Sequence, residues 1–275
     1  MCANRAHLPA LDIYRRLISA SIRSQLQYRV SFLFDLLGTG IGTAIAFGTL
    51  ALVLQRFRDI AGWTLAEIAF LYGTVETAFG IMDMVFSGFD PGGFGQRVRR
   101  GSFDQLLLRP VNLTIQVLGS EFSLRRLARI AQGAIVLFVS LLWMDVQWTV
   151  AKAVLVPIVI VGMVCFFGGL FVIGSTITFW TVQSIEVVNI FTYGGTEMMS
   201  YPMSIYTKWL RRFFTFVIPA IFLNYYPALY ILDKPDPFNM PSFAPLLSPV
   251  VGVGALLVAL AFWNWGIRHY TSTGT

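Results

Sequence analysis

Residues 153–173 read AVLVPIVIVGMVCFFGGLFVI, a run of 21 residues without a charged side chain. About 20 consecutive apolar residues are enough for an α-helix to cross the hydrocarbon core of a bilayer. Apolar runs of this kind recur along the chain, which is 56% hydrophobic and only 12% charged, with a mean hydropathy of +0.69. A soluble domain has about 25% charged residues, because its surface must be polar. The runs therefore predict an all-α, polytopic (multi-pass) membrane protein and argue against an unusually apolar soluble domain.

The apolar runs predict six transmembrane helices within a single membrane domain over residues 31–275, without an appended catalytic domain. Their expected ranges are 31–54, 63–88, 122–143, 151–176, 183–203 and 246–267. The first range carries Gly38, Gly42 and Ala46, each four residues from the next. Small residues at this spacing form a smooth stripe on which another helix packs closely in lipid.

Residues 1–30 precede the first span and contain no apolar run of spanning length. Apolar and polar side chains recur there at helical spacing on two different faces: Leu11, Tyr14, Ile18 and Ile22 on one, Arg15, Ser19 and Arg23 on the other. Such a helix lies in the membrane interface with its arginines toward anionic headgroups. We expect an N-terminal interfacial helix on the cytoplasmic side.

The stretch of about 204–245 before the last span is the least regular part of the membrane domain. Its apolar run 213–231 is interrupted by Pro219 and Pro227. Broken helices that do not span are tolerated where protein buries them. We expect an extracellular re-entrant hairpin; a complete crossing would instead give seven spans and place the C-terminus outside.

The distribution of positive charge predicts the orientation. Placing residues 1–30, residues 89–129 and the C-terminus in the cytoplasm puts 13 of the 20 lysines and arginines inside. Cytoplasmic loops of membrane proteins carry such an excess. We therefore expect both termini in the cytoplasm. The net charge of +6 is explained by orientation, and no nucleic-acid partner is expected.

Several kinds of enzyme site are excluded by composition. The three lysines, Lys152, Lys208 and Lys234, do not follow a glycine, so the chain contains no G-x-x-x-x-G-K phosphate-binding loop. The two histidines, His7 and His269, lie near the ends of the chain. A histidine-built metal site or a histidine general base inside the membrane is thereby excluded. We expect neither catalytic residues nor a metal site in this chain.

Residues 97–112, RVRRGSFDQLLLRPVN, are the most informative polar segment. Gly101 interrupts the chain after a basic run, and Ser102 or Asp104 is placed to cap a short helix. Pro110 disfavours helical conformation in the residue before it and so ends that helix. The pattern predicts a short amphipathic helix between two spans.

This helix lies within a cytoplasmic loop of about 89–121. A soluble partner that binds a helix in this position can displace it, and the displacement is transmitted to the spans on either side. An ordinary cytoplasmic loop with positive charge fits the spacing equally well.

The motif RRGSFDQLLLRPVN resembles the loop between the second and third helices of type-2 ATP-binding-cassette (ABC) exporter permeases. It is most similar to their bacterial branch with a G-x-F/L-D-x-L-L-L-R-P pattern. The likeness extends over nearly the whole chain: an interfacial helix, six spans and a proline-rich hairpin before the last helix. Tyr201-Pro202, followed by Trp209-Leu210 and Pro219, resembles the end of that family's fifth helix and its re-entrant segment.

The resemblance implies a transmembrane permease subunit in a bacterial cytoplasmic (inner) membrane. Two such chains, identical or paralogous, enclose a transport path, and two separate ABC ATPase subunits bind ATP and magnesium, so this chain itself holds no cofactor and is not an enzyme. Homodimer and heterodimer both remain open. The short cytoplasmic helix contacts the ATPases in that family, which makes the coupling candidates Arg100, Gly101, Phe103, Asp104, Leu107, Arg109 and Pro110.

Carboxylates in the apolar runs form a second set of candidates, for the substrate path: Glu76, Asp83, Glu186 and Glu197. Glu76 and Asp83 are seven residues apart and share one helical face. Ionisable groups at membrane depth are costly, which points to function. The functional interpretation is that these carboxylates line the path or sense protons. The structural interpretation is that they form hydrogen bonds between helices. Glu76, near the middle of its span, is the strongest path candidate.

Two other classes of function compete with an ATP-driven permease. An ion-coupled secondary transporter would use Glu76 and Asp83 as proton carriers, although no internal repeat typical of such folds is visible. An intramembrane enzyme would use the carboxylates as acid and base. The second alternative is the weaker, because no histidine and no clear nucleophile accompany the acidic pair.

Overall fold

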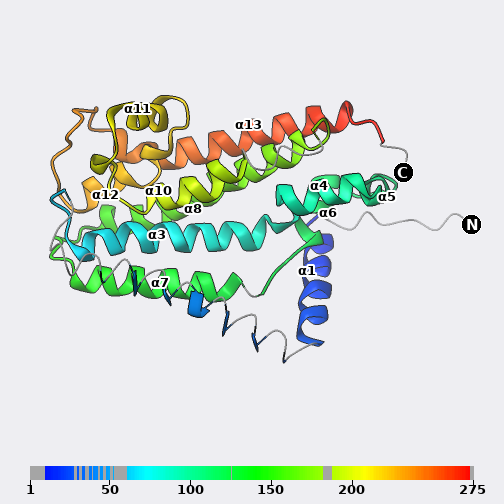
Figure 1. Cartoon of the computed structure of the whole chain (residues 1–275), viewed down its shortest axis with the longest axis horizontal. Helices are drawn as coiled ribbons and strands as arrows, with labels where there is room; N and C mark the ends of the chain where they lie inside the picture. The colour runs from blue at the N-terminus through cyan, green and yellow to red at the C-terminus, as the bar shows by residue number, and fades with distance from the viewer. Residues whose placement is uncertain are drawn as a thin grey trace, which may run out of the picture.

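Four long apolar helices form the body of the molecule (Figure 1). The computed structural model describes residues 10–27, 61–124, 126–181 and 188–272, with isolated positions from 30 to 52. The helices long and apolar enough to cross a membrane are α3 (Leu65–Val85), α7 (Arg126–Trp143), α8 (Val150–Ile177) and the continuous stretch Ala244–Arg268, whose main part is α13 (Ser248–Arg268). No β-strand occurs among the described residues. The prediction of an all-α polytopic membrane protein is confirmed.

Shorter elements lie at the two ends of these helices. They are α1 (Ala10–Gln27), η1 (Ser87–Phe89), α4 (Pro91–Arg99), α5 (Ser102–Leu107), α6 (Leu113–Ser120), η2 (Ile190–Gly194), α10 (Gly195–Met199), η3 (Met203–Ile205), α11 (Lys208–Phe216), η4 (Ala220–Phe222), α12 (Tyr225–Ile231) and η5 (Ala244–Leu247).

The second, third, fourth and last predicted spans correspond to α3, α7, α8 and α13 within a few residues. The first, 31–54, lies outside the described residues except for isolated positions. At two of those positions, Gly38 and Gly42, an added Cβ would meet nothing within 4 Å, so these two glycines make no close contact with the described chain. The fifth, 183–203, is described only from residue 188 and consists of the π-helical turn η2 and α10.

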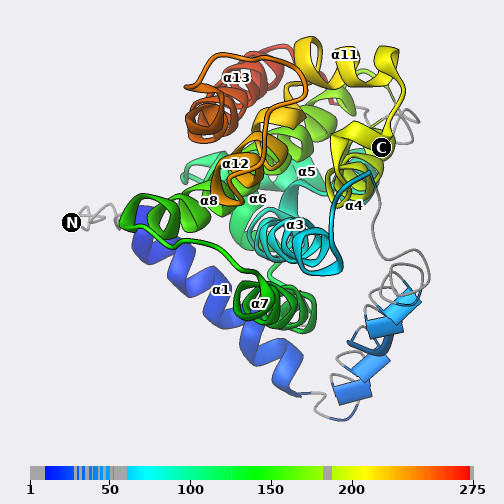
Figure 2. The same cartoon turned by 90° about the vertical axis from the view of Figure 1, so that its left-hand side faces the viewer.

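α3 is the central helix, and most of its side chains are buried inside the bundle (Figure 2). It packs antiparallel to α7 through glycines. A Cβ on Gly73 would lie 2.6 Å from the backbone nitrogen of Leu137, and one on Gly133 would lie 2.6 Å from that of Thr77. Because lipid supplies no hydrophobic drive between helices, such close backbone contact is a principal source of their attraction.

α8 and α13 pack against one another in the same way. A Cβ on Gly252 would lie only 2.0 Å from the carbonyl oxygen of Gly162, and one on Gly169 would lie 3.1 Å from that of Ala255. Close glycine contacts among the described residues therefore lie between α3 and α7 and between α8 and α13, and not at the predicted stripe of the first span.

α1 and α11 lie across the long axis of the bundle, at opposite ends (Figures 1 and 2). α1 packs against α6, where Leu17 fills the space beside Gly119. The Gln25 side chain donates to the carbonyl of Phe122 and accepts from the backbone N–H of Leu124 at 2.9 Å. α1 is fastened to the segment that leads into α7, and its place in the membrane interface stays a prediction.

The hairpin before the last span is broken, as Pro219 predicts. α11 and the stretch Ala220–Ile231 meet at an angle of 80°. The second predicted break is wrong: Pro227 lies in the first turn of α12. A helix tolerates proline there because its missing N–H is not needed for an intrahelical hydrogen bond.

Ion pairs fasten the hairpin to the end of the bundle opposite α1. Lys152 at the start of α8 contacts Asp233 at 2.5 Å, and Lys234 contacts Glu67 at the start of α3 at 3.0 Å. The Lys234 ammonium also lies 5.0 Å from the ring centroid of Trp63. The chain that follows α12 is thereby tied to the first turns of two long helices.

The contact between α8 and α13 predicts a difference between two neighbouring glycines. Gly252→Ala is expected to lower the free energy of unfolding by about 1–3 kcal/mol, because the new methyl group overlaps the backbone of α8. Gly254→Ala is the matched control, since nothing lies within 4 Å of its Cβ position. Thermal unfolding in detergent measures both, and equal midpoints for the two variants would contradict this packing.

Candidate functional site

The polar segment between α3 and α6, residues 90–112, forms a bent projection that we call the elbow. It lies at the same end of the bundle as α1 (Figure 1). Asp90 caps α4, because its carboxylate accepts from the backbone N–H of Gly93 at 2.9 Å. Gly101 has φ +66°, a left-handed conformation that favours glycine, and it makes the turn into α5.

The short helix predicted in this segment is α5, and it ends at Leu107, before Pro110 as expected. The predicted capping residue is wrong. Gly101 occupies the capping position without a side-chain hydrogen bond, and the Ser102 hydroxyl donates to the carbonyl of Arg97 at 3.1 Å. Asp104 has a different role.

Asp104 joins the elbow to the end of the chain. Its carboxylate accepts from the Tyr270 hydroxyl at 3.0 Å and from the Ser272 hydroxyl at 2.6 Å. Burial and the hydrogen bond to Asp104 raise the pKa of Tyr270 to about 12, so the phenol stays protonated and keeps donating at neutral pH. Asp104 therefore fixes α5 to the segment after α13.

Phe103 anchors the elbow to the long helices. Its side chain is fully buried, and its ring centroid lies 5.3 Å from Phe94, 5.3 Å from Phe179 and 5.1 Å from Tyr270. Trp263 of α13 completes the cluster at 6.3 Å. Aromatic pairs at such distances attract one another beyond simple area burial. A displacement of α5 therefore acts directly on the ends of α8 and α13.

Arg97 is a second anchor, on the side of α3. Its guanidinium donates to the carbonyl of Gly88 at 2.9 Å and to the hydroxyl of Ser120 at 2.7 Å, and it contacts Glu121 at 3.1 Å. These groups follow α3 and end α6. The elbow is thus bonded to both helices between which it lies in sequence.

The end of α5 and the residues after it, 107–110, form the exposed tip of the elbow. Leu108 is 85% exposed and Leu107 is 42% exposed, while Arg109 and Pro110 are exposed beside them. Arg100 is also exposed, at the other end of α5. An apolar pair flanked by arginines is a surface suited to a protein partner.

The seven coupling candidates thus divide into two groups. Gly101, Phe103 and Asp104 shape the elbow or attach it to the chain; the exposed ones are Arg100, Leu107, Arg109 and Pro110. Leu108 was missed by sequence reasoning. The signal for it was the run of three leucines at 106–108. Three consecutive side chains cannot all lie on one buried face of a helix, so at least one of them points outward.

Two buried carboxylates of α3 pair with arginines of α7. Arg129 binds Glu76 through two hydrogen bonds, Nε to Oε2 at 2.6 Å and Nη2 to Oε1 at 2.9 Å. Arg126 contacts Asp83 at 2.5 Å. The Arg129 guanidinium also lies 4.5 Å from the ring centroid of Phe79. A bidentate pair of this kind is among the strongest side-chain hydrogen-bond arrangements.

Arg126 and Arg129 point from the first turn of α7 to α3 and neutralise its carboxylates. The signal was the pattern of opposite charges on neighbouring spans, with acids at 76 and 83 and bases at 126 and 129. In an antiparallel pair of helices this order brings each acid opposite a base.

The other two path candidates are not brought into this arrangement. Glu197 is exposed on α10, where it forms no ion pair with a described residue. Glu186 lies outside the described residues. The role of the four carboxylates in a substrate path stays a prediction, and for Glu76 and Asp83 the arginine partners give a separate reason for their burial.

The pairing of α3 with α7 predicts non-additive effects on stability. Glu76→Met leaves the partly buried guanidinium of Arg129 without its carboxylate partner and is expected to cost about 3–5 kcal/mol of unfolding free energy. Replacing both Glu76 and Arg129 by methionine removes both charges and is expected to recover most of that loss. Unfolding in detergent measures the cycle.

Glu197→Met is the control for this cycle, because it removes an exposed carboxylate and is expected to change stability by less than about 0.5 kcal/mol. A double variant as unstable as the single one would show that the two residues do not stabilise the fold as a pair.

A comparison with known protein families agrees with this architecture. The sequence model of the family described as ABC-2 family transporter protein matches residues 41–274, which is most of the chain. No curated protein and no solved structure matches the chain. The match includes the elbow, the four long helices and the broken hairpin. On this finding, the chain belongs to the ABC-2 family of transporter proteins.

Proposed function

We propose that this chain is the permease subunit of an ABC exporter, in which two permease chains enclose the substrate path and separate ATPase subunits drive transport. The observation that supports the proposal is that the elbow has an exposed tip and a buried anchor. Its tip exposes Leu108 and Arg109, while one turn earlier Phe103 is buried against the ends of α8 and α13. Such an element has one surface for a partner and one attachment to the spans.

In this mechanism the chemistry belongs to the partner, which binds ATP and magnesium. When ATP binding closes the ATPase subunits, they displace the elbow tip. Phe103 passes the displacement to α8 and α13, and Arg97 passes it to the end of α3 through Gly88. The spans of the two protomers then rearrange, and an amphipathic or lipid-like substrate leaves toward the outside.

We further propose that the elbow and both termini face the cytoplasm of a bacterial inner membrane, with the broken hairpin outside. The positive charge supports this orientation, because Arg99, Arg100 and Arg109 of the elbow lie at the same end as the exposed arginines of α1. A second copy of the chain or a paralogue completes the path. The exposed apolar side chains of α7 and α13 then face lipid or that second permease.

The alternative, an ion-coupled transporter, requires Glu76 and Asp83 to take up and release protons during transport. Both carboxylates already contact guanidinium groups of the same chain. A proton carrier at either position has to break its ion pair in every cycle.

ATP dependence separates these functions. The chain is purified alone and together with the ATPase encoded beside it, and both samples are reconstituted in liposomes. We expect no ATP hydrolysis by the permease alone, and we expect transport of a lipid-like reporter only with the ATPase and ATP. Hydrolysis by the lone permease, or transport driven by a pH gradient without nucleotide, would overturn the proposal.

The elbow tip predicts a local effect on assembly. Leu108→Ser removes the most exposed apolar side chain of the tip and is expected to weaken binding of the ATPase about tenfold, since burial of a leucine contributes about 1.5–3 kcal/mol. Leu246→Ser at the opposite end is the matched control, because Leu246 is also exposed. Binding is measured by titrating the ATPase against permease in detergent. An equal loss with both variants, or none with Leu108→Ser, would exclude the tip as the docking surface.

A further inference from the structure

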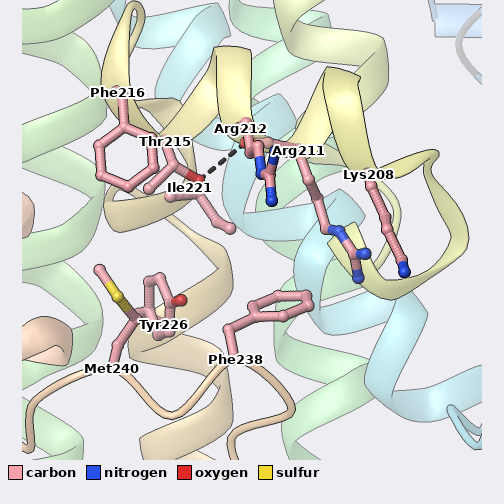
Figure 3. A pocket seen from close by; sticks show the side chains of 9 residues that line it. All are labelled: Lys208, Arg211, Arg212, Thr215, Phe216, Ile221, Tyr226, Phe238 and Met240. Carbon is pink, nitrogen blue, oxygen red and sulfur yellow. Dashed lines mark hydrogen bonds between the residues drawn. The ribbon is translucent and has the colours of Figure 1, made fainter.

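The broken hairpin encloses a cavity of about 400 Å³ that the proposed mechanism does not use (Figure 3). One wall is α11, which presents Lys208, Arg211 and Arg212. The opposite wall is made by Tyr226 of α12 and by the chain that follows it. Cavities that hold small ligands have volumes of about 300–1,000 Å³, so the size is sufficient for a headgroup.

The three cations of α11 differ from the basic side chains that hold the bundle together. Arg97, Arg126, Arg129, Lys152 and Lys234 each contact a carboxylate. None of the three α11 cations forms an ion pair within the part of the chain that the structure describes. Three positive charges in neighbouring turns repel one another, and an anion between them relieves that repulsion.

The loop opposite these cations is held in place by its own acidic residue. The two carboxylate oxygens of Asp236 accept from the backbone N–H groups of Phe238 at 2.8 Å and of Met240 at 2.6 Å. Asp236 thereby folds the loop so that Phe238 and Met240 line the cavity. The Arg211 guanidinium lies 4.5 Å from the Phe238 ring centroid, which fixes one cation at the mouth (Figure 3).

The surroundings of the cavity are those of a membrane interface. On α11, Trp209 is 69% exposed and Phe216 is 77% exposed, and Val217 beside them is also exposed. α11 lies across the bundle axis (Figure 2). Its sequence, KWLRRFFTF, places apolar side chains and cations on two faces of the helix, as in helices that lie parallel to the membrane surface. The anions abundant at that depth are lipid headgroups.

We propose that this cavity binds the phosphate-bearing headgroup of an anionic lipid. The phosphate lies between Lys208, Arg211 and Arg212, and the first carbons of the tails follow Phe216 toward the bilayer. Guanidinium groups suit phosphate because they donate parallel hydrogen bonds to its oxygens. That this site faces the outer leaflet of the membrane follows from the proposed function. The binding of the lipid headgroup does not depend on that function.

The binding is tested on the full chain, purified without an ATPase in a neutral detergent. Calorimetric titration compares three probes: dihexanoylphosphatidylglycerol, dihexanoylphosphatidylcholine and inorganic phosphate. We expect saturable binding of the phosphatidylglycerol at least tenfold tighter than of either other probe. Equal affinity for the phosphatidylcholine would overturn the role of the cations, and equal affinity for inorganic phosphate would overturn a lipid site.

A triple variant and a matched control locate the site. Replacing Lys208, Arg211 and Arg212 together by glutamine is expected to weaken phosphatidylglycerol binding at least tenfold. Replacing three exposed arginines at the opposite end, Arg99, Arg100 and Arg268, by glutamine removes the same charge and is expected to leave the affinity unchanged. An equal loss in both triple variants would show a nonspecific charge effect and overturn the proposal.

A substitution in the apolar wall tests whether the lipid binds inside the cavity or only to the surface charge of α11. Met240→Trp fills the cavity from the loop while it leaves all three cations in place, and it is expected to weaken binding at least tenfold. Thermal unfolding in the same detergent verifies that each variant keeps its fold. Should the α11 triple variant not fold, Met240→Trp decides alone, and unchanged affinity in that variant would exclude the cavity. Because no nucleotide or ATPase is present, failure here leaves the proposed transport function untouched.

Discussion

Two ion pairs inside the membrane domain, Glu76 with Arg129 and Asp83 with Arg126, set the relation between α3 and α7. An isolated charge at this depth is costly, so each partner requires the other. Glycines on both helices bring the backbones close enough for the pairs to form. α3 in turn is the central helix against which α8 packs and from which the elbow projects. The position of the elbow therefore depends on the register of α3 against α7.

The elbow combines an exposed tip with a buried anchor over a few residues. Leu108 faces outward, and Phe103 lies in an aromatic cluster with side chains from α4, α13 and the chain after α8 and α13. Asp104 and Arg97 add polar contacts to the C-terminal segment and to the ends of α3 and α6. A force applied to the tip is therefore distributed over several long helices, because interiors this densely packed transmit displacement.

The two ends of the molecule share one feature, an amphipathic helix across the bundle, but the two helices have different surroundings. At each end one amphipathic helix, α1 or α11, lies across the bundle and carries exposed cations. α1 packs against α6 and is fastened to the segment that leads into α7. α11 lies over a cavity whose other wall is shaped by Asp236. The cationic side of α11 therefore has room for a ligand, whereas two other cations at that end, Lys152 and Lys234, are used to hold the chain in place.

The sequence by itself determined the membrane fold, the positions of four long helices, the short helix before Pro110 and the break at Pro219. These follow from local rules, since length, hydropathy and proline geometry act within one segment. Tertiary structure decided which side chains meet. In the folded chain Arg129 pairs with Glu76, and Asp104 accepts a hydrogen bond from Tyr270 and does not cap α5. A close glycine contact lies at Gly252. None of these follows from one segment alone, because each depends on the rotation and register of two helices that are distant in sequence.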